Sequence, residues 1–387
     1  MINYGKQSID QEDINSVKSV LEGDWLTQGP YIKSFENSLK SYFKSDYACA
    51  VSNGTAALHL AGLALGWSEN DIVITSPLTF LASANSIIYC RATPDFVDID
   101  SSTYTLDVNL LEKKIKNLIC ENKKVKAVVG IDYAGHPCDW ESISILCKQY
   151  DIKLINDNCH ALGSEINNDK GYAVKYADLV TQSYHPVKHI TSGEGGSVLS
   201  NNSNLIEKVR LLRSHGMQKN NLISNDKNLP WYYEMHDLGF NYRLTDFQCA
   251  LGNSQLKKLD NFIAKRRSIA KMYDVAFKSL DPVIIPSVKK GVSHSYHLYP
   301  LLIDFNKTSF SKLEFFNQMK ERGINLQVHY IPVHLQPYYS LNYNFKPGDF
   351  PVSEKFYEQE FSIPIFNDLD ESQVEYVIDS IFSIFNT

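Results

Sequence analysis

The sequence predicts an α/β protein with a mainly parallel central sheet, followed by a smaller α+β domain. Between about residues 47 and 200, short apolar runs typical of strands alternate with longer segments of helical periodicity, which is the pattern of a parallel sheet with crossover helices. Beyond residue 280, the pattern changes to a strand, a helix and an aromatic-rich loop. The 387 residues therefore predict a large domain over 1–250 and a smaller domain over 251–387, joined by a long helix over about 245–275.

The predicted elements follow one another in chain order. A helix begins near Ser8–Glu12 with the polar residues of a capping box and ends at Gly23, and a second helix covers about 31–43. Strands are predicted at 47–51, 71–75, 94–99, 125–129, 152–155, 177–181 and 197–200. The helices between the first five open near residue 54 and cover 80–90, 108–118 and 140–150. Later elements are a helix over 203–216, a loop over 217–236, a linker or hairpin over 281–292, a strand over 297–303, a helix over 309–322 and an aromatic-rich loop over 327–339.

The overall composition argues against several classes of protein. The chain carries a net charge of −6 and no basic block, which disfavours nucleic acid as a partner. Its seven cysteines are an odd number without a CxxC pair, so we expect reduced thiols and neither a disulfide framework nor a metal site. No apolar run approaches the length of about 18 residues that a membrane span needs, and the N-terminus lacks the apolar region of a signal peptide. We therefore expect a cytoplasmic protein without membrane contact.

One lysine lies in the polar loop that separates the last two predicted strands of the sheet. Ser183 precedes Lys188 by five residues, and Gly195 and Gly196 follow it. A lysine held in a partly dry site has a lowered pKa and suits a Schiff base, and glycines let the backbone pass close to a bound ring. Taken alone, the same lysine also fits an ordinary solvated loop.

Three further features follow predicted strands, at the edge where parallel α/β sheets bind their ligands. Asn53-Gly54-Thr55 opens a helix, and the amides of a helix N-terminus attract an anion such as phosphate. Phe80 offers a ring for stacking, and Asp157 places a carboxylate at a strand tip, where it needs a hydrogen-bonding or cationic partner. Each feature alone also fits a helix cap or core packing.

Together, these four features match the needs of pyridoxal 5′-phosphate (PLP). The phosphate of PLP suits the helix N-terminus, a carboxylate keeps the ring nitrogen protonated so that the ring accepts electrons, and a lysine holds the aldehyde carbon as a Schiff base. The sequence therefore predicts a PLP enzyme with Asp157 and Lys188 at the centre of its site.

Longer stretches of the sequence resemble one family of enzymes over nearly the whole chain. The matching runs are SNGTAALHL, PLTF, NDNCHALGS, SYHPVK, GEGG, LRSHGM, GFNYRLTDFQCALG, HLYP and VHYIPVHLQPYY. These motifs, in this order, are similar to those of the DegT/StrS family of sugar aminotransferases, which implies the PLP fold type I of aspartate aminotransferase. RSHGM, FNYRL, HLYP and QVHY resemble in particular the members that act in pseudaminic acid biosynthesis.

The resemblance also implies roles for individual residues. It places the Schiff-base lysine at Lys188, the partner of the pyridinium nitrogen at Asp157, and the neighbour of the ring hydroxyl at His160. Further cofactor contacts are implied at Gly54, Thr55, Phe80, Ser183 and Asn241. Asn241 would reach the site of the partner subunit, which implies a homodimer with shared active sites. Contacts to the sugar nucleotide are implied by position at Tyr4, Trp25, Leu26, Thr27, His185, Arg243, His329 and Tyr330.

The family implies a reaction in which L-glutamate gives its amino group to the C4 ketone of a UDP-linked 4-keto-6-deoxy sugar of the N-acetylhexosamine type. Three alternatives stay open: a PLP-dependent sugar dehydratase, an aminotransferase for a different nucleotide-linked keto sugar, and a relative that keeps the fold without catalysis. Dehydratases of the family carry histidine in place of the lysine, so Lys188 favours transamination. A nicotinamide-dependent oxidoreductase is disfavoured because no GxGxxG motif follows the first strand.

Overall fold

The computed structural model of the protein describes residues 1–219, 222–223 and 229–386. A sheet in the order β1-β8-β7-β5-β4-β2-β3 forms its centre. Its strands are β1 (Tyr47–Val51), β2 (Asp71–Thr75), β3 (Thr93–Phe96), β4 (Lys124–Ile131), β5 (Lys153–Asp157), β7 (Leu179–Ser183) and β8 (Gly196–Ser200). β8 runs antiparallel to both of its neighbours, whereas β7, β5, β4, β2 and β3 are parallel. The prediction of a mainly parallel sheet is confirmed.

Helices cover both faces of this sheet because its strands are apolar on both sides. On β5, the side chain of Leu154 enters one hydrophobic core and that of Ile155 enters the other. The first core is completed by α2 (Pro30–Phe43), α5 (Val108–Cys120), α6 (Trp140–Gln149), α7 (Tyr172–Tyr176) and the first half of α9 (Asp246–Phe277). The second core is completed by α3 (Gly54–Ala64), α4 (Leu81–Tyr89) and α8 (Ser203–Arg213).

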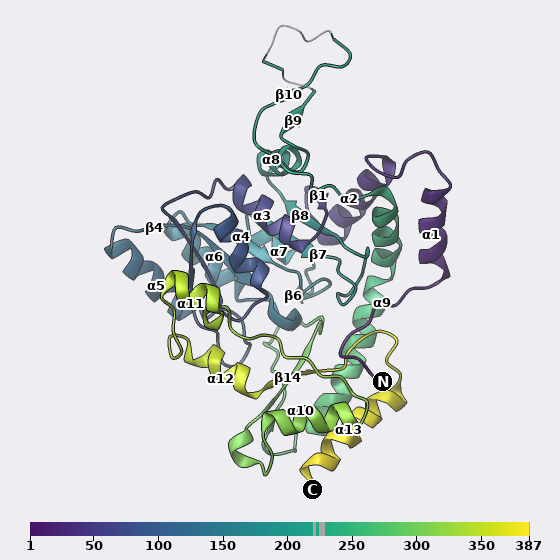
Figure 1. Ribbon diagram of the computed structural model, residues 1–387, viewed down its shortest axis with the longest axis vertical. Helices are drawn as coiled ribbons and strands as arrows, with labels where there is room; N and C mark the ends of the chain where they lie inside the picture. Colours follow the sequence, from purple (N-terminus) through teal and green to yellow (C-terminus); the bar gives the residue numbers. More distant parts are fainter. Residues whose placement is uncertain (220–221, 224–228, 387) are drawn as a thin grey trace.

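The long helix α9 connects the large sheet with a smaller C-terminal part (Figure 1). Its second half, from Ile269 to Phe277, packs in a third core. That core also contains a three-stranded sheet and two further helices, namely β11 (Val283–Ile284), β13 (Tyr299–Ile303), β14 (Glu360–Ile363), α10 (Lys312–Glu321) and α13 (Glu371–Phe385). Near the N-terminus, α1 (Gln11–Leu21) packs on α9, and Ile2 pairs with Ile324 of the C-terminal part. The domain division at residue 250 stays a prediction.

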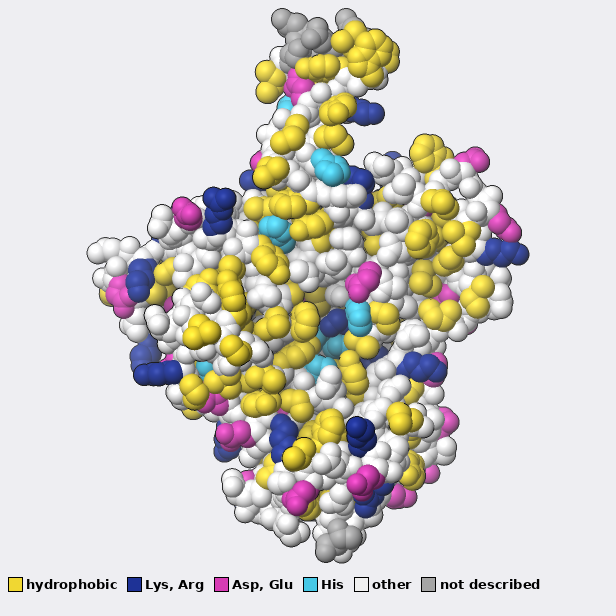
Figure 2. All heavy atoms as spheres, viewed as in Figure 1, with side chains coloured by type: hydrophobic (Ala, Val, Ile, Leu, Met, Phe, Trp, Pro, Cys, Tyr) yellow, Lys and Arg dark blue, Asp and Glu magenta, His cyan; other side chains and the backbone are white. Residues whose placement is uncertain are grey.

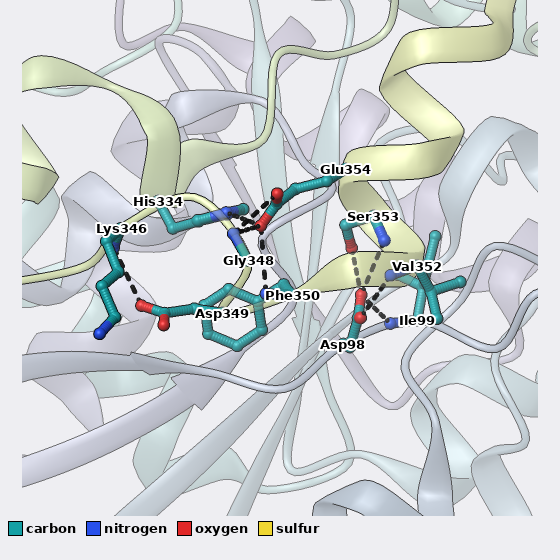
Figure 3. A network of polar contacts seen from close by, with 10 residues as sticks. All are labelled: Asp98, Ile99, His334, Lys346, Gly348, Asp349, Phe350, Val352, Ser353 and Glu354. Atoms are coloured by element: carbon teal, nitrogen blue, oxygen red, sulfur yellow. Dashed lines mark hydrogen bonds and ion pairs between the residues drawn. The ribbon is translucent and has the colours of Figure 1, made fainter.

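Two carboxylates attach the C-terminal aromatic loop to the large sheet (Figure 3). Asp98, just after β3, accepts hydrogen bonds from the Val352 amide at 2.8 Å and the Ser353 hydroxyl at 2.6 Å, at the start of α12 (Pro351–Gln359). Glu354, in the same helix, accepts a hydrogen bond from Nε2 of His334 at 2.9 Å. Because His334 belongs to the loop over 327–339, these contacts fix that loop beside the carboxyl ends of the strands.

Several predicted boundaries are wrong for identifiable reasons. The helix predicted over 203–216 ends at Arg213, because His215 and Gly216 both adopt positive φ, which terminates an α-helix. The segment 281–292 is not a hairpin: β11 pairs with β13, whereas β12 (Val292–Ser293) pairs with β6 (Glu165–Ile166). The aromatic-rich loop ends early, because α11 (Pro337–Tyr343) begins at the helix-starting Pro337.

The segment predicted as a loop over 217–236 projects from the body of the protein beyond α8 (Figure 1). Its described parts include a short antiparallel pair, β9 (Met217–Gln218) and β10 (Glu234–Met235). Residues 220–221 and 224–228 of this segment lie outside the described residues. Within the described part of the chain, no helix combines the length and the apolar character needed to cross a membrane.

Candidate active site

Lys188 lies in the loop that connects β7 to β8, and its side chain is half-buried. Its Nζ atom is 3.4 Å from Nε2 of His297. Burial lowers the pKa of Lys188 from its ordinary value, although the nearby Cys159 and Asp157 act in the opposite direction. The loop therefore presents a lysine whose amine loses its proton more readily than an exposed lysine does, as the sequence predicted.

Asp157 is the last residue of β5 and is 6% exposed. Its Oδ2 accepts a 2.7 Å hydrogen bond from the hydroxyl of Ser83, which lies in α4, and its Oδ1 accepts one from the Cys159 amide at 3.3 Å. The Ser83 hydroxyl is in turn 2.8 Å from the hydroxyl of Thr79. A buried carboxylate at the end of a parallel strand is thus held by donors from the neighbouring helix and the next turn.

His160 follows β5 and meets the C-terminal aromatic loop. Its Nδ1 accepts a hydrogen bond from the Ala134 amide at 3.4 Å, so the ring proton resides on Nε2, which donates to the hydroxyl of Tyr330 at 3.1 Å. Burial, and then the charge of Lys188, hold the pKa of His160 well below its usual range. His160 is therefore a neutral donor at pH 7, and it positions Tyr330 across the site.

Gly54 and Thr55 form the first turn of α3, after the N-cap residue Asn53. A Cβ atom on Gly54 would lie 3.0 Å from Cβ of Ser183, so a larger residue would push the helix start away from the end of β7. The hydroxyl of Ser183 therefore lies close to the N-terminus of α3 and its first backbone amides. Such a group of donors suits a phosphate.

Phe80 is the residue just before α4, and its side chain is 56% exposed. Its ring centroid is 6.0 Å from that of Tyr330. An exposed phenylalanine is unusual in a region that otherwise packs well, and it leaves one aromatic face available to a flat ligand. Figure 2 shows histidine and basic side chains in a hollow near the centre of this face, with hydrophobic side chains around it.

The structure brings some of the predicted sugar-nucleotide residues to this site. Tyr4 packs on His329, with ring centroids 5.2 Å apart, and His329 precedes Tyr330. Burial, together with Lys188, lowers the pKa of His329 to about 3. Tyr4, His329 and Tyr330 therefore form one aromatic wall of the site.

Other predicted residues lie elsewhere in this chain. The loop of Trp25, Leu26 and Thr27 is attached to the start of α9, where the Asp246 amide donates to the Leu26 carbonyl at 2.9 Å. Arg243 lines a cavity of about 470 Å³ beside α2 and α8, and Asn241 and His185 are exposed. Among the described residues, no hydrogen bond or ring contact joins the side chains of these six residues to Lys188, Asp157 or His160.

Three site residues have no counterpart among the residues predicted from the sequence. Ser83 occupies the middle of an ordinary helical segment, and nothing in the pattern marks it. His297 was visible only as the first letter of the HLYP motif, and Glu360 as an acid in an apolar strand. Their roles depend on contacts between segments that are distant in sequence.

The residues of this site fit PLP on the evidence of the structure itself. The Gly54 turn leaves a cradle that a Cβ atom would fill, the buried carboxylate of Asp157 lies at a strand end, and a half-buried lysine lies on the next loop. Gly54, Thr55 and Ser183 would hold the phosphate, Phe80 the ring face, and Asp157 the ring nitrogen. The fold and this site together define a PLP-dependent enzyme of the aminotransferase fold.

The chain belongs to the DegT/DnrJ/EryC1/StrS aminotransferase family, whose sequence model matches residues 7–382. It is 39% identical over 387 residues to the UDP-4-amino-4,6-dideoxy-N-acetyl-beta-L-altrosamine transaminase of Campylobacter jejuni, with 99% of this chain and 97% of the relative covered. Its structure is similar to that of PseC from Helicobacter pylori, an aminotransferase involved in the biosynthesis of pseudoaminic acid, with a TM-score of 0.89, 33% identity and coverage of 100% and 99%.

The PMP form of a proposed sugar aminotransferase, Spr1654 from Streptococcus pneumoniae, gives a TM-score of 0.90 at 26% identity, with coverage of 100% and 99%. These similarities extend over the whole chain. The predictions of the fold, the family and the PLP cofactor are confirmed, and the protein is a PLP-dependent sugar aminotransferase.

Proposed function

We propose that this enzyme transfers the amino group of L-glutamate to the C4 ketone of a UDP-linked 4-keto-6-deoxy-N-acetylhexosamine, in a pathway of the pseudaminic acid type. Full-length similarity to a transaminase named for a UDP-4-amino-4,6-dideoxy sugar supports this substrate. The half-buried lysine beside a buried carboxylate is the single observation that carries the proposal, because an amine exchange needs both. Glutamate leaves as 2-oxoglutarate, and the sugar ketone becomes an amine.

PLP, when bound, supplies a ring that accepts the electrons released at the amino-bearing carbon. Lys188 would hold the aldehyde carbon of the cofactor in the resting enzyme. Once free, its Nζ atom takes the proton from Cα of L-glutamate and later delivers a proton to C4 of the sugar, acting as base and then as acid. Burial supports the first role, because it lowers the pKa of the amine and increases the neutral fraction.

Asp157 stabilises a protonated ring nitrogen in this proposal, and its two donors keep the carboxylate oriented. His160 stays neutral, and its Nε2–H group would hold the ring hydroxyl of the cofactor by turning to it from the hydroxyl of Tyr330, without adding a charge.

The aromatic wall is the proposed binding surface for the sugar. His329 is held at three points: its amide donates to Glu360 at 2.9 Å, its Nδ1 contacts the Ser362 hydroxyl at 2.8 Å, and its carbonyl accepts from the hydroxyl of Tyr133. Because the Ser362 hydroxyl donates to Glu360 at 2.6 Å, it accepts from Nδ1–H of His329. Nε2 of His329 is then an acceptor, which suits a sugar hydroxyl.

We further propose a homodimer in which Asn241 completes the phosphate site of the partner subunit. The same site of the partner subunit would also be contacted by Trp25, Leu26, Thr27 and Arg243. These residues lie beside or within the segment that carries Asn241, because Leu26 and Thr27 pair with the start of α9. The projecting segment that contains β9 and β10 supports the formation of a dimer, since its described part and the residues just after it expose many large apolar side chains (Figure 2). These side chains are Met217, Ile223, Leu229, Trp231, Tyr233, Met235 and Leu238.

The cytoplasm is the proposed compartment, because all seven cysteines are unpaired.

Product analysis tests the proposed reaction most directly. The purified enzyme is incubated with ¹⁵N-labelled L-glutamate and a panel of nucleotide-linked keto sugars that vary in nucleotide and in keto position. The proposal predicts ¹⁵N at C4 of a UDP-linked sugar and stoichiometric 2-oxoglutarate. Loss of the C3 hydroxyl without nitrogen uptake would instead identify a dehydratase, and preference for another nucleotide or for a 3-keto sugar would contradict the proposed substrate.

A further inference from the structure

We propose that His297 is a positioning residue for Lys188: its Nε2–H group donates a hydrogen bond to the neutral amine and holds the lysine ready to accept a proton. This inference rests on the proposed role of Lys188 as the carrier of the proton. His297 lies two residues before β13, in the C-terminal part, whereas Lys188 lies on the loop before β8. The contact therefore couples the two parts of the chain at the reacting amine.

The contact with His297 is the polar contact that fixes the amine. The distance from Nζ of Lys188 to Nε2 of His297 is 3.4 Å, and within the described part of the chain Nζ has no other hydrogen-bond partner. Asp157 influences Lys188 electrostatically, but no hydrogen bond or ion pair joins the two among the described residues. Because the lysine side chain is flexible, its only described hydrogen-bond partner determines how the amine is oriented.

His297 is itself held rigidly, as a positioning residue must be. It is 4% exposed, and its ring packs against His160 and His189, with centroid distances of 4.4 and 5.5 Å. The buried guanidinium of Arg266 binds the carbonyl of His297 at 3.3 Å and that of Ile365 at 2.9 Å. Both the ring and the backbone of His297 are thus fixed before any ligand binds.

The position of the ring proton follows from the unpaired nitrogen. Burial, and then the charge of Lys188, hold the pKa of His297 well below its usual range, so the ring carries a single proton. Nδ1 is buried and has no hydrogen-bond partner among the described residues. A proton on Nδ1 would be a buried unpaired donor, which is rarer and costlier than a buried unpaired acceptor. The proton therefore belongs on Nε2, where it points at Lys188.

The groups around Lys188 favour its neutral form in the same way. A neutral amine accepts a hydrogen bond from Nε2–H, whereas an ammonium group repels it. Burial also disfavours the ammonium form, and only Asp157 and Cys159 oppose it. The titratable groups that face Lys188 are Asp157, Cys159, His160, His189, His297 and His329.

The test measures the reactivity of Lys188 in cofactor-free protein. Each sample is treated with trace acetic anhydride at a series of pH values, and mass spectrometry reports the acetylation of the peptide that contains Lys188. The exposed Lys257 on α9 is quantified in the same sample as an internal reference. In His297→Phe the ring shape is kept and the donor is lost, whereas His297→Gln keeps a donor of similar reach.

The proposal predicts that His297→Phe raises the midpoint of Lys188 labelling by about 0.7 pH units, the equivalent of one ordinary hydrogen bond. It predicts that His297→Gln stays close to the wild type and that Lys257 is unaffected. A midpoint that is unchanged or lower in His297→Phe overturns the proposal. Equal shifts in both variants also overturn it, since the effect would then come from packing and not from the donor.

A second measurement covers the case in which the substituted proteins do not fold. The ¹⁵N chemical shifts of the His297 ring in the wild-type protein distinguish the two tautomers: a proton on Nε2 supports the proposal, and a proton on Nδ1 overturns it. Neither experiment needs substrate or cofactor. Trapping of PLP on Lys188 with borohydride is measured separately, so failure of the proposed function and failure of this inference give different results.

Discussion

The hydroxyl of Ser83 in α4 donates a 2.7 Å hydrogen bond to Oδ2 of Asp157 at the end of β5. Both groups are buried, at 1% and 6% exposure, so no water replaces the donor if it is removed. The relationship joins a helix on one face of the sheet to the carboxylate that, in our proposal, supports the cofactor ring.

Ser83→Ala should therefore impair catalysis while leaving the fold intact. A hydrogen bond to a charged group contributes about 1.5–3 kcal/mol, so we expect a decrease in the rate of the glutamate half-reaction of about tenfold to a hundredfold. Stopped-flow absorbance of the PLP-loaded enzyme measures this rate. Ser86→Ala is the matched control, because the Ser86 hydroxyl binds only the backbone carbonyl of Ser83. Equal rates in wild type and Ser83→Ala would contradict the role of this hydroxyl.

Glu360→Gln should separate binding of the sugar from reaction with glutamate. Glu360 accepts the amide of His329 and the hydroxyl of Ser362, and an amide group in its place offers one acceptor fewer. We expect KM for the keto sugar to increase about tenfold, which corresponds to the loss of about 1.4 kcal/mol, and the glutamate half-reaction to keep its rate.

Steady-state and half-reaction kinetics measured on one preparation test this separation. Glu358→Gln, at an exposed position of α12, makes the same substitution without these contacts and is expected to behave as the wild type. A similar loss in both half-reactions would show that Glu360 does not act through the sugar-binding wall.

Buried histidines should make the protein sensitive to acid. Burial lowers the pKa of eight of them in the folded state, to about 4 for His136 and about 3 for His329. The other six are His59, His160, His189, His294, His297 and His334. Because unfolded histidines titrate near pH 6.5, the unfolded chain binds protons first as the pH falls. Stability present above about pH 6.5 is therefore lost progressively towards pH 4.

Two buried carboxyls act in the opposite sense in this window. Burial raises the pKa of Glu360 to about 8 and that of Asp132 to about 6, so each binds a proton more tightly in the folded state. Because more histidines than carboxyls are shifted, we expect unfolding near pH 5 to take up protons net, with a slope of about 1.4 kcal/mol per pH unit for each proton.

Urea unfolding between about pH 4.5 and 7 measures this slope. His136→Gln should reduce the uptake by about one proton, whereas replacement of the exposed His185 should leave it unchanged. A flat dependence of the unfolding free energy on pH over this range would show that these histidines are not held neutral.

Much of the fold was predictable because its signals are local. The alternation of strands and helices, Gly54 at a helix start and Lys188 in a polar loop all appear within short windows of sequence. Asp157 was predictable because ligands bind at the ends of parallel strands.

Ser83 and His297 could not be predicted, because each acquires its role from a partner far away in sequence: Asp157 is 74 residues from Ser83, and Lys188 is 109 residues from His297. The boundaries at Arg213 and Pro337 were mistaken for a different reason. There the backbone conformation of two residues, or one proline, decides where a helix ends or begins, and periodicity alone does not show it.

In our proposal Lys188 exchanges an amino group through PLP, and an absorbance spectrum before and after addition of L-glutamate shows this exchange. We predict a band near roughly 410–430 nm in the PLP-loaded enzyme that shifts towards about 330 nm with glutamate. Lys188→Ala should neither shift in this way nor turn over, with activity reduced by about 10⁴-fold or more. A wild-type enzyme without the first band, or a Lys188→Ala enzyme that still aminates a keto sugar, would contradict the account.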